Sequence, residues 1–179
     1  MCDKVIIMQE GCHWDWMEDP VSTMVWFYNQ LLDADLLLCH NDADVKYYQG
    51  ITDKKAMILP TLMIEDNIKT AKKEDRVFVA GNWHLTYRGY KFMYELSKCR
   101  YGIQTYQSSA GQFPLNCAYL GIPCIGYNDV NTQIQLHPEL SVDRGDIVQA
   151  RKLAQKLQKD TEFYTECSQK TKTLYNKLY

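Results

Sequence analysis

The sequence lacks the features that would tie it to nucleic acid or to a membrane. It has 20 Lys and Arg residues against 22 Asp and Glu, and a formal net charge of −2 creates no positive field for a phosphate backbone. No apolar run approaches the roughly 20 residues of a transmembrane helix, and the first residues do not have the long apolar stretch of a signal peptide. These absences predict a cytoplasmic protein without a nucleic-acid partner or a membrane span.

Cysteine spacing gives no sign of a metal site or of a disulfide framework. The seven cysteines are scattered, none of them form a CxxC pair, and no His lies near two of them at zinc-ligand spacing. Cys39, Cys117 and Cys124 lie inside apolar runs and are typical of small buried side chains. We therefore expect no metal, no cofactor and no disulfide scaffold.

The composition is that of a globular protein, with 46% hydrophobic and 23% charged residues. Aromatic residues crowd the first 30 positions, where Trp14, Trp16, Trp26, Phe27 and Tyr28 are found. This crowding indicates either a core with a domain interface or an aromatic platform for a sugar ring.

The first half of the chain alternates short β-branched or apolar runs with helical patterns. Asp19 before Pro20 predicts a helix start, Asp42 predicts a second cap, and Gly50 predicts a helix end. Strand, helix, strand, helix, strand at this spacing indicates right-handed βαβ units and a parallel sheet. The expected strands are residues 4–8, 35–39 and 55–59, and the expected helices are residues 20–33 and 43–49.

A polar stretch, residues 64–76, separates a second alternating half from the first and predicts a boundary. We assign residues 1–68 to one small Rossmann-like lobe and residues 69–179 to another. In the second lobe we expect strands at 77–80, 101–106 and 122–127, helices at 89–98, 113–120, 146–160 and 162–179, and a polar loop at 128–135. The predicted fold class is α/β, with two parallel-sheet lobes and a C-terminal helix.

The best candidate for a ligand site is the loop and helix start from Ser108 to Asn116. In open parallel sheets ligands gather at the carboxyl ends of the strands, and this segment follows a predicted strand. A small-residue loop that runs into a helix presents backbone N–H groups and the positive end of the helix dipole, which suit a diphosphate. An ordinary helix cap is the alternative. The predicted phosphate-binding residues are Ser108, Ser109, Ala110, Gly111, Gln112 and Asn116.

A second candidate segment follows the predicted strand 77–80. Gly81 and Asn82 begin this loop, His84 can orient or titrate, and Arg88 can bind a phosphate through two N–H groups. The alternative for Arg88 is a solvated helix start.

Two further predictions concern catalysis and sugar recognition. Glu10 follows the first strand, and a carboxylate there, or His84, can deprotonate an acceptor hydroxyl. Thr132 and Gln133 lie in the polar loop at 128–135, whose amide groups can read sugar hydroxyls.

The order of these motifs resembles the donor-binding half of the retaining glycosyltransferases of the GT-B fold. Gly121-Ile122-Pro123 matches the end of the family's donor helix, and counting back places Asn116 and Ser108 on its two glutamates. Gly81 with Arg88 looks like the family's diphosphate loop. The first half of the chain is similar to the later strands of the family's acceptor lobe. The sequence as a whole most resembles glycosyltransferase-like proteins of phage and marine metagenomes.

The resemblance implies transfer of a sugar from a nucleotide-sugar donor to a glycan or another hydroxyl acceptor, without a metal. The chain departs from the family at both glutamates, which are Ser108 and Asn116 here, and it has about half the usual length. A shortened, non-catalytic relative that binds a nucleotide or glycan, or that serves as a subunit, is the alternative function. A flavodoxin-like single sheet with another phosphate ligand is the alternative fold, and it predicts one continuous sheet.

Overall fold

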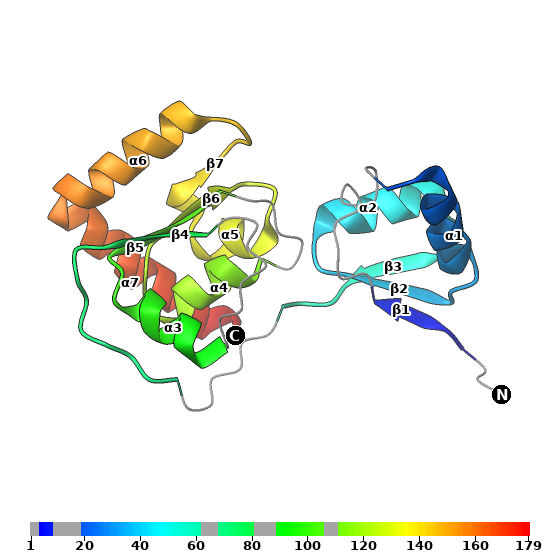
Figure 1. The fold of residues 1–179 in the computed structure, drawn as a ribbon, viewed down its shortest axis with the longest axis horizontal. Helices are drawn as coiled ribbons and strands as arrows, with labels where there is room; N and C mark the ends of the chain where they lie inside the picture. The colour runs from blue at the N-terminus through cyan, green and yellow to red at the C-terminus, as the bar shows by residue number, and fades with distance from the viewer. Residues whose placement is uncertain (1–3, 9–18, 62–67, 81–88, 106–110) are drawn as a thin grey trace. The chain divides into compact units, whose positions relative to one another are not determined.

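The computed structural model describes residues 4–8, 19–61, 68–80, 89–105 and 111–179. The chain divides into two compact units, the first ending at Thr61 and the second containing the described residues from Ile68 onward. Ile68, at the predicted boundary between residues 68 and 69, packs against a core cluster of the second unit. Figure 1 shows the helices and strands of both units, and each unit is described by itself below.

The first unit is a three-stranded parallel sheet with two helices. The strand order is β1-β2-β3, and β2 pairs with both neighbours in parallel. Both helices lie on the same side of the sheet (Figure 1), and Phe27 and Leu31 of the first helix pack on Leu37 and Ala56. In chain order the elements are β1 (Ile6–Met8), α1 (Val21–Leu32), β2 (Leu36–Cys39), α2 (Asp42–Ile51) and β3 (Lys55–Ile58).

The helix ends of the first unit differ from the sequence predictions. The N-cap residue of α1 is Pro20 rather than Asp19, and no side-chain cap bond is found there within the described part of the chain. In α2 the N-cap is Asn41 rather than Asp42, since Asn41 Oδ1 accepts from the Asp44 N–H at 2.8 Å. Helix α2 also continues through Gly50, because Thr52 supplies the C-cap. Neighbouring residues of similar chemistry compete for each cap, and local geometry selects among them.

The second unit contains a four-stranded parallel sheet in the order β4-β5-β6-β7. Each strand pairs with the next strand along the chain, so the connecting helices advance the sheet one strand at a time. The elements are β4 (Val77–Ala80), α3 (Gly89–Ser97), β5 (Tyr101–Gln104), α4 (Gln112–Tyr119), β6 (Cys124–Tyr127), α5 (Asn131–Leu136), the 3₁₀-helix η2 (Pro138–Leu140), β7 (Ser141–Val142), α6 (Ile147–Lys159) and α7 (Thr161–Leu178).

The two faces of this second sheet carry different cores. On one face, α3 and α4 pack on Phe78 and Cys124 through Met93 and Phe113. On the opposite face, α6 packs through Leu153 and Leu157 against a cluster that includes Tyr101, Ile125 and Val142. Figure 1 shows α6 on one side of the sheet and α3 and α4 on the other.

The predicted polar loop at 128–135 is wrong, because Asn131–Leu136 forms helix α5 and the short strand β7 follows. Thr132, Gln133 and Leu136 of α5 are buried, and Leu136 packs with Leu115 of α4. The spacing of apolar residues does not predict this helix, because its buried residues include polar ones. Buried polar residues are held by hydrogen bonds, which the sequence pattern does not show.

The predicted α/β class with two small parallel-sheet lobes and a C-terminal helix is confirmed. The described strands form two separate sheets, so the alternative of one continuous flavodoxin-like sheet is wrong. No helix in the described ranges is long and apolar enough to cross a membrane.

Gly102 in β5 provides a test of the packing between sheet and helix. A Cβ atom at this position would lie 2.9 Å from Phe113 Cζ and 3.0 Å from Cys117 Sγ, both on α4. We therefore expect Gly102→Ala to reduce the free energy of unfolding by about 1–3 kcal/mol through overpacking. Urea denaturation followed by circular dichroism measures this loss. The exposed control Gln155→Ala on α6 should change stability by less than about 0.5 kcal/mol, and an equally stable Gly102→Ala protein would contradict the packing described.

Candidate functional site

The candidate site lies at the carboxyl edge of the β4-β5-β6-β7 sheet. Ala80 and Gln104, the last residues of β4 and β5, are register partners in a parallel pair. The pairing continues one residue further, because the Thr105 N–H donates to the Ala80 carbonyl at 2.8 Å and Thr105 Oγ1 donates to the same oxygen at 3.0 Å. The two segments predicted to bind phosphate therefore leave the sheet from adjacent points.

Several predicted site residues lie outside the described residues and stay predictions. Each of them lies in a segment that directly follows β1, β4 or β5 along the chain. These residues are Glu10, Gly81, Asn82, His84, Arg88, Ser108, Ser109 and Ala110.

Gly111 begins the described part of the site as the N-cap residue of α4, and it has a left-handed backbone with φ +59°. A Cβ atom here would lie 2.0 Å from Thr132 Oγ1, so both the backbone conformation and the space require glycine. Thr132 Oγ1 donates a hydrogen bond of 2.7 Å to the Gly111 carbonyl. The start of α4 is thus fastened to α5 by a buried hydroxyl.

Gln112 and Asn116 lie one turn apart on α4 and contact each other. Gln112 Nε2 donates to Asn116 Oδ1 at 2.8 Å, and Asn116 is 8% exposed. The structure therefore brings together two of the residues predicted to contact the donor. The amide oxygen of Asn116 already accepts this hydrogen bond from Gln112. A ligand would therefore be bound by the amide N–H₂ group of Asn116, which donates.

Thr132 and Gln133 are both buried, in contrast to residues of an exposed loop. Gln133 Nε2 donates to the carbonyl of Cys124 at 2.9 Å and lies 3.4 Å from the Leu140 carbonyl, so the side chain joins β6 to the turn before β7. Thr132 and Gln133 thus stabilise the start of α4 and the strand β6 through buried hydrogen bonds. Their contact with a donor sugar stays a prediction.

His137 is a structural residue of the site that sequence reasoning missed. Its ring is buried, with Nε2 3.0 Å from the Pro114 carbonyl in the first turn of α4. On the other side of the ring, Nδ1 accepts from the Cys124 N–H at 3.3 Å and lies 2.9 Å from Thr171 Oγ1. Nε2 therefore carries the proton of a neutral ring. Burial lowers the pKa of His137 to about 4, and the hydrogen bond to Pro114 opposes this shift.

The signal for His137 was weak, because a histidine before a proline is also typical of a turn. Its role depends on α4, β6 and α7 meeting at one point, which no local pattern encodes. The described residues contain no group of three or more His, Cys, Asp or Glu side chains placed to hold a metal ion.

Comparison with known proteins identifies no family. No protein-family model matches the chain, and no curated protein matches it.

Thr132→Val tests the bond that fastens the start of α4. The substitution keeps the shape of the side chain but removes the shorter of two hydrogen bonds to the buried Gly111 carbonyl, which also accepts from the Leu115 N–H at 3.3 Å. We expect a loss of about 1 kcal/mol of unfolding free energy. The control is Thr165→Val, which removes the 2.8 Å bond to the Thr161 carbonyl on the exposed surface of α7, and we expect a change below about 0.5 kcal/mol. Equal losses in the two variants, measured by chemical denaturation, would refute the bracing role.

His137 predicts a pH dependence of stability. Because its folded-state pKa of about 4 lies below its ordinary value of about 6.5, the unfolded chain binds the extra proton first as the pH falls. The stabilisation is fully present above pH 6.5 and is lost as the pH falls through 4, with a slope of up to about 1.4 kcal/mol per pH unit. We expect His137→Gln to lose about 2 kcal/mol less than the wild type between pH 7 and pH 5 in urea denaturation. Identical pH profiles for the two proteins would show that His137 is not held neutral.

Proposed function

We propose that the chain binds a nucleotide sugar at the carboxyl edge of its second sheet and transfers the sugar to a hydroxyl acceptor, as a reduced GT-B glycosyltransferase. One observation carries the proposal. The parallel pairing of Ala80 with Gln104, extended by Thr105, starts the two predicted phosphate-binding segments side by side. Diphosphates bind at helix N-termini beside the carboxyl ends of parallel strands, and two adjacent strand ends can supply donors from two segments.

In the proposed reaction the bond between the anomeric carbon and the diphosphate breaks, and a bond from that carbon to the acceptor oxygen forms. The acceptor proton passes to the predicted base His84, and the diphosphate leaves with the bonding electrons. Arg88 and the N–H groups that open α4 stabilise the charge that develops on the leaving phosphate, which is usually the largest catalytic contribution. The nucleotide sugar is the substrate, and the acceptor is a glycan or another hydroxyl compound.

The described residues contribute by positioning the start of α4. Gly111 allows the tight entry into the helix, Thr132 holds its carbonyl, and His137 holds the carbonyl of Pro114. The first-turn N–H groups are therefore kept in place without the reorganisation that would reduce their effect on a developing charge.

A second candidate function is binding without turnover. The family's two glutamates correspond to neutral Ser108 and Asn116 here, and Asn116 already accepts a hydrogen bond from Gln112. This internal bond favours a protein that holds a nucleotide or a glycan but does not activate the donor sugar.

A binding assay and a turnover assay separate the two functions. We expect UDP or GDP to raise the midpoint of thermal unfolding, because a ligand that binds only the folded state stabilises it. Arg88→Gln should weaken nucleotide binding about tenfold or more, through the loss of a charged hydrogen-bond donor. Arg76→Gln is the matched control, because Arg76 precedes β4 at the opposite end of the same strand and is paired with Glu74.

Release of UDP or GDP from UDP-glucose or GDP-mannose then measures turnover. Binding with release supports the glycosyltransferase, and binding without release supports the non-catalytic protein. No thermal shift with either nucleotide would contradict both the transfer reaction and nucleotide binding.

A further inference from the structure

A cavity of about 230 Å³ lies in the second unit, between the sheet and the N-terminal half of α6. It is on the face of the sheet opposite α4, because Ile103 and Ile125 point toward α6 whereas Gly102 packs against α4. The cavity is therefore separate from the start of α4, where the proposed function places a diphosphate. Most of its wall is apolar and includes Ile103, Ile125, Val142, Ile147, Ala150 and Ala154.

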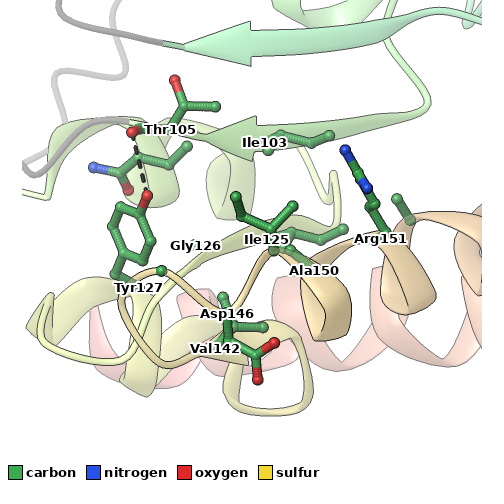
Figure 2. Close-up of a pocket in the computed structure, with 13 residues that line it drawn as sticks. Ile103, Thr105, Ile125, Gly126, Tyr127, Val142, Asp146, Ala150 and Arg151 are labelled. Carbon is green, nitrogen blue, oxygen red and sulfur yellow. Dashed lines mark hydrogen bonds between the residues drawn. The ribbon is translucent and has the colours of Figure 1, made fainter.

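Polar groups lie at the two ends of this apolar wall (Figure 2). At one end Tyr127 donates its hydroxyl to the Thr105 carbonyl at 3.3 Å, which holds the ring in place. At the other end Arg151 extends from α6 toward β5 and lies near Ile103 in Figure 2. An arginine at the end of an apolar wall can bind the negative group of a ligand whose apolar body packs on that wall.

Arg151 is available for a ligand. Within the described part of the chain its guanidinium has no ion pair or hydrogen bond. Asp146 also lines the cavity, but its carboxylate accepts from the Gln149 N–H at 2.9 Å as the cap of α6. Figure 2 shows the Asp146 carboxylate turned away from Ile103 and Arg151. Asp146 thus caps the helix, whereas Arg151 has no partner among the described residues.

A second polar group of the wall also lacks a partner. Gln104 lines the cavity, is 5% exposed, and has a buried Oε1 without a hydrogen bond among the described residues. Buried acceptors without a donor cost free energy, and they are often satisfied by a ligand or by an ordered water.

We propose that this cavity is a second binding site, for a small organic anion built on one apolar ring, such as an aryl carboxylate. An apolar cavity of about 150 Å³ is enough to hold benzene, so 230 Å³ accommodates a ring with one acidic substituent. The ring packs on Ile103, Ile125 and Ala150, and the acidic group binds Arg151. The inference is independent of the nucleotide site and goes beyond the proposed transfer reaction.

The test compares benzoate with benzyl alcohol, which has a similar ring and no charge, on the full chain. Methyl NMR titrations of the wild type should show shifts at Ile103, Ile125 and Ala150, with benzoate bound about tenfold more tightly than benzyl alcohol. Arg151→Gln should bring the two affinities together. Lys152→Gln, an exposed neighbour on α6 that does not line the cavity, should leave the ratio unchanged.

Ala150→Phe is the steric test, because a ring placed there fills the cavity and should weaken both compounds more than tenfold. Arg151→Gln, at an exposed position, keeps the proposal testable if the filled variant does not fold. Saturating UDP should leave benzoate binding unchanged. The proposal is overturned if benzoate shifts no cavity methyl, if Arg151→Gln preserves the preference for benzoate, or if UDP displaces benzoate.

Discussion

The parallel pairing of β4 with β5 is the constraint on which the candidate site depends. It is bracketed by the Arg100 N–H bond to the Arg76 carbonyl at 2.7 Å and by the Thr105 N–H bond to the Ala80 carbonyl at 2.8 Å. Between these bonds the four residues of each strand are in register. The evenly spaced backbone hydrogen bonds of a parallel ladder fix the register of the two strands that they join. The two segments that carry the predicted phosphate ligands therefore start at one place, although more than 20 residues separate them along the chain.

Behind this edge, buried hydrogen bonds hold the start of α4 and the strand β6 in place. Thr132 and Gln133 from α5 and His137 beside it bind the Gly111, Cys124 and Pro114 carbonyls respectively. Buried polar groups are expensive unless they are paired, so such bonds define one arrangement of the helix and penalise others. A neutral His137 belongs to this arrangement, which connects stability to pH through a residue that does not itself face the proposed substrate.

The two faces of the second sheet are packed differently. The α3 and α4 face is closely packed, to the degree that a methyl group on Gly102 would overlap Phe113. The α6 face leaves a cavity beside Ile103 and Ile125, lined also by Arg151, which has no ion pair or hydrogen bond to the residues that the structure describes. A close-packed face keeps the edge rigid, whereas a less filled face has room for a ligand. A nucleotide at the edge and an apolar anion under α6 would thus contact different walls of one sheet.

Local sequence was sufficient for the alternation of strands and helices, because apolar runs bounded by glycine, proline and polar residues act within a few positions. Strand β4 was predicted at its observed bounds, and α6 differs from its prediction by one residue at each end. The special backbone of Gly111 also falls within the loop chosen from sequence. Helix α5, the cap at Asn41, the brace from His137 and the cavity at Arg151 could not be predicted in this way. Each depends on which distant groups meet a side chain once the sheet is assembled, and burial and hydrogen-bond partners are properties of that assembly rather than of any local run of residues.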